Sequence, residues 1–292
     1  MHREDNLPVA AVMMLGAALL FTLMGVLVRD VSGQLPGTEV VFFRNALGLV
    51  VLLPWLLQGG VAGLRTGHLH LHLWRSLSGV AAMYCFFHAL AHLPLAQAVL
   101  LNYTAPLFIP LIAAVLLQEP FPRPVRWAVL VGFVGIALIL KPGMVRLDLD
   151  ALIGLAAAIF TAFAFTAMRS MGKIEPTTRI VFYFGVIATL ISALPLHWTW
   201  ITPARELWGR LLLIGLLATG AQLLVTRAHA YAPAARIGPF MYSSVLFAAL
   251  FGWFLWDERL DRWSVLGGIL VAGAAILAGR DHADAKPAEV RR

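Results

Sequence analysis

The sequence predicts an all-α integral membrane protein with ten transmembrane helices, arranged as two inverted five-helix repeats. Apolar residues make up 60% of the 292 positions and charged residues only 13%, whereas a soluble domain carries about 25% charged residues. The apolar residues lie in long blocks, with the charges between the blocks. The two halves of the chain also resemble each other at a nearly constant spacing.

The apolar blocks set the number of predicted spans. A helix needs roughly 20 apolar residues to cross the hydrocarbon core, and continuous apolar runs without alternation do not fit the strands of a transmembrane β-barrel. The first block is of full length and ends in charged residues, so we expect a permanent span and not a cleaved signal peptide. The predicted spans are 9–28, 38–57, 73–91, 95–117, 125–140, 151–170, 178–196, 208–228, 234–256 and 264–279.

The charged residues are typical of a protein embedded in a lipid bilayer. The net charge is +7, but Lys and Arg are scattered singly at the ends of the blocks, which argues against a nucleic-acid-binding patch. They are more numerous in the loops on the side of the N-terminus, so we expect both termini in the cytoplasm and the chain in the inner membrane. Cys85 is the single cysteine, which excludes a disulfide within the chain and a cysteine metal cluster.

An internal repeat divides the chain into units 1–145 and 146–280, followed by a polar tail, 281–292. When the two halves are aligned at one constant offset, Tyr103 matches Tyr242 and Glu119 matches Glu258. An Ala-Pro pattern precedes each tyrosine. Because five is an odd number, a second five-helix unit enters the membrane upside down relative to the first. Such inverted repeats are common in transporters, where the substrate site lies at the repeat interface.

Several local patterns resemble the EamA family of the drug/metabolite transporter superfamily. They are Phe42-Phe43-Arg44-Asn45, Leu93 to Ala98, Tyr103 to Phe108, Glu119 with Arg126-Trp127, and Gly132 to Gly135. The resemblance covers nearly the whole chain as two units. It implies ten helices, a central cavity, and export or uptake of small metabolites such as amino acids. The second unit departs from the pattern, with Ser243-Ser244-Val245 where the first has Thr104-Ala105-Pro106.

Arg44 is the clearest candidate for substrate binding, because a charge inside a span requires a partner or a water-filled cavity. A guanidinium in a cavity could bind a carboxylate through two hydrogen bonds. The alternative is a structural pair with Glu39 or a backbone carbonyl. Acidic residues lie at the edges of the spans, so a zwitterion or a carboxylate-bearing anion fits better than a cation. The other predicted substrate-binding residues are Tyr84, His88, Asn102, Tyr103, Gln222, Tyr242 and Ser243.

Two prolines in the fourth span, Pro106 and Pro110, predict a kinked cavity wall or a moving gate. Glu119 and Glu258 follow the fourth and ninth spans. They could act as gates or pair structurally with the neighbouring Arg126 and Arg262. His88 is also the candidate for proton coupling, or else a structural hydrogen-bonding group. The alternation of His68, His70 and His72 suggests a metal site only weakly, because no fourth ligand is evident.

The predicted function is therefore secondary transport of an amino-acid-like zwitterion or a carboxylate-bearing metabolite by alternating access, with export favoured over uptake. The alternatives are an uptake permease for a larger metabolite, such as S-adenosylmethionine or a vitamin, and a non-transporting membrane receptor or scaffold. The sequence lacks the motifs of a membrane enzyme or of a nucleotide-driven pump, and no cofactor or metal is expected. Gly132, Gly135, Gly267 and Gly268 could permit close helix contacts, including those of a homodimer.

Overall fold

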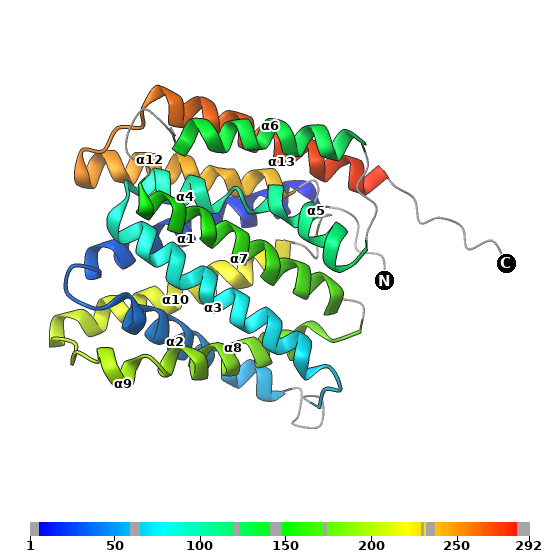
Figure 1. Ribbon diagram of the computed structural model, residues 1–292. Helices are drawn as coiled ribbons and strands as arrows, with labels where there is room; N and C mark the ends of the chain where they lie inside the picture. Colours follow the sequence, from blue (N-terminus) through cyan, green and yellow to red (C-terminus); the bar gives the residue numbers. More distant parts are fainter. Residues whose placement is uncertain are drawn as a thin grey trace.

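The computed structural model describes residues 6–58, 65–118, 123–140, 148–171, 174–228, 231 and 237–284. Within these ranges the regular structure is helical (Figure 1). The helices of the first unit are α1 (Leu7–Val31), α2 (Gly37–Gln58), α3 (Leu69–His92), α4 (Leu95–Asn102), α5 (Ala105–Leu116) and α6 (Arg123–Leu140). Those of the second unit are α7 (Leu149–Met171), α8 (Thr177–Ala193), α9 (Leu196–Thr199), α10 (Arg205–Ala228), the 3-10 helix η2 (Gly238–Tyr242), α12 (Ser243–Trp256) and α13 (Arg262–Asp284).

Each of the ten predicted spans falls on one of these helices or on a broken helix. Five helical segments are long and apolar enough to cross a membrane: α1, the α4–α5 pair, α6, α7 and α10. The apolar parts of α8, of η2 with α12, and of α13 are shorter. The chain is therefore a multi-pass membrane protein, while ten crossings and the side on which the termini lie stay predictions.

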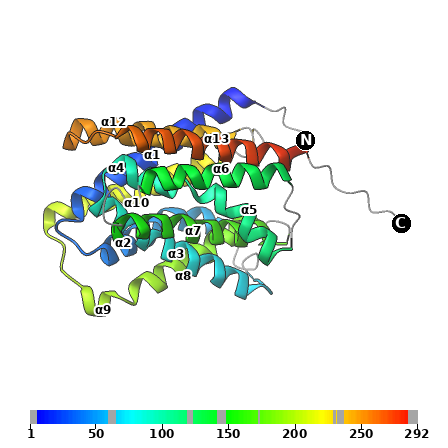
Figure 2. The same cartoon turned by 45° about the horizontal axis from the view of Figure 1, so that its top comes forward.

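The long helices lie side by side in one bundle with two ends (Figures 1 and 2). We call the end where α1 begins and α13 finishes the terminal end. The opposite end, where α1 finishes and α2 begins, is the distal end. Helices from the two units pack directly on each other, as α3 does on α7, α1 on α10, and α6 on α13. The interior of the bundle is therefore shared between the two units.

The predicted kink in the fourth span is confirmed as a break between α4 and α5. α4 ends at Asn102 and α5 begins at Ala105, so that Pro106 lies in the first turn of α5, where its missing N–H costs no helical hydrogen bond. The Thr104 hydroxyl donates to the carbonyl of Leu101 at 2.7 Å. The matching segment of the second unit is also irregular, because η2 precedes α12.

Glycines allow the closest helix contacts. A Cβ atom on Gly135 would lie 2.7 Å from the carbonyl oxygen of Gly267, and one on Gly267 would lie 2.5 Å from that of Gly135. Gly132 faces Leu107, and Gly268 faces Leu100. These four glycines, which we considered for a homodimer, thus make their close contacts within the chain. Close backbone approach through small residues is the usual way in which membrane helices pack.

Candidate functional site

Tyr103 and Tyr242, which occupy equivalent positions in the two repeats, meet in the interior. The Tyr242 hydroxyl donates to the backbone carbonyl of Tyr103 at 3.2 Å, and the ring centroids are 5.7 Å apart. The Tyr103 hydroxyl lies 2.9 Å from that of Ser244. The two tyrosines come from the broken helices α4–α5 and η2–α12, where the irregular backbone leaves carbonyls free to accept side-chain hydrogen bonds.

The tyrosine pair extends to α1 through two hydroxyls. The Ser244 hydroxyl donates to the carbonyl of Ala18 at 3.4 Å, and the Thr22 hydroxyl donates to the same carbonyl at 2.8 Å. The hydroxyl of the predicted Ser243 instead donates to the carbonyl of Phe240, within its own turn. Of the two adjacent serines, Ser244 is therefore the one that is hydrogen-bonded to the tyrosine pair.

A second arginine, Arg75, lies on α3, which packs against the helix of Arg44. The helix rise puts Arg44 roughly 10 Å from the distal end of α2, and Arg75 roughly 9 Å from the terminal end of α3. The helices that carry the two arginines pack on each other, and both also pack on α8. Arg75 stacks on the ring of Phe184 at 4.0 Å, and Arg44 donates to Asn45 Oδ1 at 2.9 Å. We call Arg44 and Arg75 the arginine pair.

The arginine pair is positioned between α2, α3 and α8. Asn45 on α2 donates to the Ser192 hydroxyl on α8 at 3.5 Å, and this bond joins the two helices beside Arg44. In the part of the chain that the structure describes, no carboxylate forms an ion pair with Arg44 or Arg75. The Arg75 Nε atom is buried and has no hydrogen-bond partner there. The arginine pair thus places positive charge inside the bundle, and a bound anion could neutralise it.

The structural alternative for Arg44, a pair with Glu39, is wrong. Glu39 is fully buried in the first turn of α2, and its carboxylate accepts a hydrogen bond from the backbone N–H of Ile201. That bond fastens the distal end of α2 to the segment between α9 and α10. The carboxylate is therefore committed to the distal end, away from the arginine pair.

The other predicted binding residues lie in varied settings. Tyr84 on α3 packs against the core, and its hydroxyl is buried with no hydrogen-bond partner among the described residues. Asn102 is half-buried at the end of α4, and Gln222 on α10 is exposed. Pro110 lies inside α5 without interrupting it. No described hydrogen bond or ion pair joins Arg44 to Tyr103 or Tyr242, so the arginine pair and the tyrosine pair are separate polar groups.

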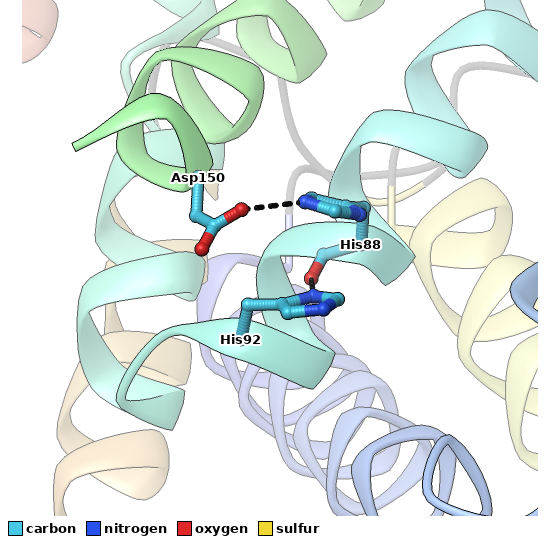
Figure 3. A group of neighbouring side chains, drawn as sticks. All are labelled: His88, His92 and Asp150. Carbon is cyan, nitrogen blue, oxygen red and sulfur yellow. Dashed lines mark hydrogen bonds and ion pairs between the residues drawn. The ribbon is translucent and has the colours of Figure 1, made fainter.

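His88 lies in the last turn and a half of α3, at the distal end (Figure 3). Its Nε2 atom is 2.7 Å from Asp150 Oδ1, at the start of α7. Its ring stacks on that of His92, with centroids 4.1 Å apart. Both His88 and Asp150 are about one-third exposed. His88 is therefore an interfacial group that links α3 to α7 and does not face the middle of the bundle.

Glu258 links three segments at the distal end. It forms an ion pair with Arg29 on α1, and it accepts a hydrogen bond at 2.8 Å from the backbone N–H of Leu95. Arg29 also stacks on Trp256 at 4.4 Å. The predicted pairing of Glu258 with Arg262 is therefore wrong. Asp257 has a left-handed backbone conformation (φ 53°) and ends α12. The chain turns at this residue, so that Glu258 lies next to Arg29 on α1. Glu119 lies outside the described residues.

Glu175, which lies between α7 and α8, joins several segments at the terminal end, as Glu258 does at the distal end. Its buried carboxylate accepts hydrogen bonds from the Thr66 hydroxyl and from Arg179, whose Nη1 lies 2.6 Å away. Burial raises the pKa of Glu175, but these two hydrogen bonds and the charge of Arg179 outweigh burial and hold the pKa below its usual value. His72 Nε2 lies 3.9 Å from the same carboxylate. Of the three alternating histidines, His68, His70 and His72, it is therefore His72 that takes part in this buried contact.

These features together are typical of a polytopic membrane transporter: broken, repeat-related helices that meet in the interior, two arginines inside the bundle that form no ion pair with the described carboxylates, and polar connections at both ends. The family model of the EamA-like transporter family matches the chain twice, at residues 8–141 and 149–280. The chain belongs to this family.

Curated relatives agree with this class. The chain is 38% identical over 268 residues to the pseudopaline exporter CntI of Pseudomonas aeruginosa (strain UCBPP-PA14), covering 90% of this chain and 93% of the relative. It is 29% identical to a riboflavin transporter of Brucella anthropi (83% and 87% covered) and 26% identical to an S-adenosylmethionine uptake transporter of Rickettsia prowazekii (88% and 89% covered). These relatives are transporters and not enzymes.

A solved crystal structure shares the fold, with a TM-score of 0.61 at 21% identity, covering 92% of this chain and 96% of the other. At this identity the likeness concerns the fold alone.

Sequence reasoning missed Arg75, Arg29 and Glu175, because each stands near a span end where a single charge is typical of an anchor. Asp150 was missed because its partner is distant in sequence.

Proposed function

We propose that the chain exports a small metabolite that carries one or more carboxylates, by alternating access between the two repeats. The observation that carries this proposal is the arginine pair: two cations on the neighbouring helices α2 and α3, with no carboxylate paired to either among the described residues. Charge inside a membrane protein marks a substrate or ion pathway by default. Two guanidiniums favour an anionic ligand, because each can bind a carboxylate through two parallel hydrogen bonds.

The direction of transport rests on the relatives. The relative at 38% identity is named an exporter, whereas the S-adenosylmethionine uptake transporter matches at 26%. Export therefore has stronger support than uptake. The tyrosine pair supports the mechanism, because equivalent residues of the two repeats that touch at the centre must change their contact when one repeat rocks against the other.

Transport from preloaded proteoliposomes tests the proposal. The panel contains pseudopaline, riboflavin, S-adenosylmethionine, and di- and tricarboxylates, each carboxylate paired with its methyl ester. We expect a carboxylate compound to leave wild-type vesicles faster than its ester. Arg44→Gln and Arg75→Gln should each slow its efflux at least tenfold, since a hydrogen bond to a charged group contributes about 1.5–3 kcal/mol. The lysine variants Arg44→Lys and Arg75→Lys should retain more activity.

Arg205→Gln is the matched control, because Arg205 is an exposed residue at the start of α10. It should transport like the wild type. Equal efflux of acids and esters, or full activity of both glutamine variants, would contradict carboxylate recognition by the arginine pair. Absence of flux for the entire panel in either vesicle orientation would contradict the proposed substrate class.

A further inference from the structure

Two histidines and one aspartate gather where α3 ends and α7 begins (Figure 3). His88 and His92 come from the last turns of α3, and Asp150 comes from the first turn of α7. Each side chain offers one ligand atom, and these atoms all lie within 4.8 Å of one another. Imidazole and carboxylate are typical ligands of divalent transition metals.

The geometry of α3 brings the imidazole rings of His88 and His92 close together. Residues four apart lie on one helix face, and the two rings are stacked with an interplanar angle of 23°. Because an imidazole binds a metal through a lone pair in its own ring plane, the exposed His92 ring must turn before both rings can bind one ion. His92 Nδ1 donates to the backbone carbonyl of His88 at 2.9 Å. This bond leaves the Nε2 lone pair of His92 free to bind a metal. A backbone carbonyl that fixes the tautomer in this way is a common supporting interaction of metal-binding histidines.

Asp150 supplies the third ligand from another helix. Its backbone N–H donates to Asp148 Oδ1 at 3.0 Å, which holds the first turn of α7 in place. In a tetrahedral zinc site, two ligand atoms about 2.0–2.1 Å from the metal lie about 3.3 Å apart. The 2.7 Å contact between His88 and Asp150 must therefore widen slightly to admit an ion. Partial exposure of both side chains permits this movement.

We propose that His88, His92 and Asp150 form a binding site for one divalent transition-metal ion, such as Zn²⁺ or Co²⁺, with water completing the coordination. The proposal does not rest on the proposed transport of carboxylates. The ion replaces the direct contact between His88 Nε2 and Asp150 Oδ1 and recruits His92. A simple His88–Asp150 ion pair has no use for the free nitrogen of His92, so His92 distinguishes the two interpretations.

The site has a structural consequence, because α3 lies in the first family match and α7 in the second. A bound ion therefore connects the two repeats at the distal end. This connection adds to the direct packing of α3 on α7, and it should raise the temperature of unfolding, since a ligand that binds only the folded state stabilises it.

Metal binding to the purified full-length chain, without a polyhistidine tag, tests the proposal. Equilibrium dialysis gives the stoichiometry and affinity for Zn²⁺, and the visible spectrum of Co²⁺ reports the coordination. We expect about one ion per chain, and at least tenfold weaker binding in His92→Gln, His88→Gln and Asp150→Asn. His92→Gln is the cleanest variant, because His92 is exposed and stands outside the His88–Asp150 pair. Zn²⁺ should raise the melting temperature of the wild type and not that of His92→Gln.

His70→Gln is the matched control, because His70 is an exposed histidine near the opposite end of the same helix. It should bind the metal like the wild type. Unchanged affinity in His92→Gln would overturn the three-ligand site, as would an equal loss in His70→Gln. Absence of Zn²⁺ binding to a wild-type chain that is monodisperse and melts cooperatively would overturn the proposal as well.

Discussion

The hydroxyl of Tyr242 donates a hydrogen bond to the backbone carbonyl of Tyr103, the residue 139 positions earlier in the chain. The offset at which the two halves resemble each other thus brings equivalent side chains into contact. Because each tyrosine lies beside a break in its helix, the contact joins the two most irregular segments of the interior. A change in the relation between the repeats must alter this bond.

Tyr242→Phe removes that hydroxyl and keeps the ring. We expect the free energy of unfolding to fall by about 0.5–1 kcal/mol, which is typical of a hydrogen bond between membrane helices. Thermal unfolding in detergent or lipid measures the change. Ser243→Ala is the control, because the Ser243 hydroxyl donates to the carbonyl of Phe240 in its own turn. A larger loss in Ser243→Ala than in Tyr242→Phe would contradict the assigned role of the tyrosine pair.

Gly267→Ala should destabilise the packing of α6 on α13. The added Cβ would lie 2.5 Å from the carbonyl oxygen of Gly135, so the helices must separate, and overpacking of this kind costs about 1–3 kcal/mol. Gly273→Ala on the same helix meets nothing within 4 Å and should be neutral or slightly stabilising. Parallel thermal unfolding curves compare the two. Equal stability of both variants would show that the glycine contact is not tight.

Glu258→Gln should open the distal end more often. Glutamine can still accept the hydrogen bond of Leu95, but it lacks the charge that pairs with Arg29. For a partly exposed ion pair we expect a shift of about 1 kcal/mol, or roughly fivefold faster labelling of a cysteine at buried Ser244 by a membrane-impermeant thiol reagent. Cys85→Ser provides the background for this measurement.

The control for the distal end is Asp30→Asn. Asp30 pairs with Arg210 at 3.0 Å, and both side chains are far more exposed than Glu258 and Arg29. Water already screens that pair, so labelling should change little. If Asp30→Asn accelerated labelling as much as Glu258→Gln, general loosening of the end would explain the result, and a specific role of Glu258 would be contradicted.

Glu175 gives the stability of the terminal end a defined pH dependence. Its pKa is lowered in the folded chain by the Thr66 and Arg179 hydrogen bonds, which outweigh burial. The carboxylate therefore stabilises the fold fully above its unfolded pKa of about 4.3, and this contribution is lost as the pH falls through the lower folded value. Glu175→Gln should reduce the melting temperature at pH 7.

The difference between wild type and Glu175→Gln should then shrink in acid. Melting curves from pH 7 to pH 3 test this sign, with Glu206→Gln as a control at an exposed acidic position on α10. A difference that grows as the pH falls would contradict the assigned pKa shift.

The sequence predicted the helical membrane architecture, the repeat offset and the break in the fourth span, because hydropathy, spacing and proline act locally. It also selected Arg44, Tyr103 and Tyr242 as candidates, and the structure places Tyr103 and Tyr242 in contact, while their role in binding stays a prediction. It did not identify the partners of Arg29, Glu175 or His88, since these contacts join residues on different helices. The pairing of Glu258 was predicted wrongly for the same reason: the left-handed turn at Asp257 carries it past its neighbour Arg262.

In the proposed transport cycle, the two repeats must separate alternately at each end. Arg29→Cys with Glu258→Cys, in a Cys85→Ser background, places two thiols where the end of α1 meets the segment between α12 and α13. A reversible thiol cross-linker should stop efflux from proteoliposomes of the panel compound that the wild type transports. A reductant should restore it, while each single-cysteine chain stays active under the same treatment. Undiminished efflux through a fully cross-linked chain would contradict alternating access between the repeats.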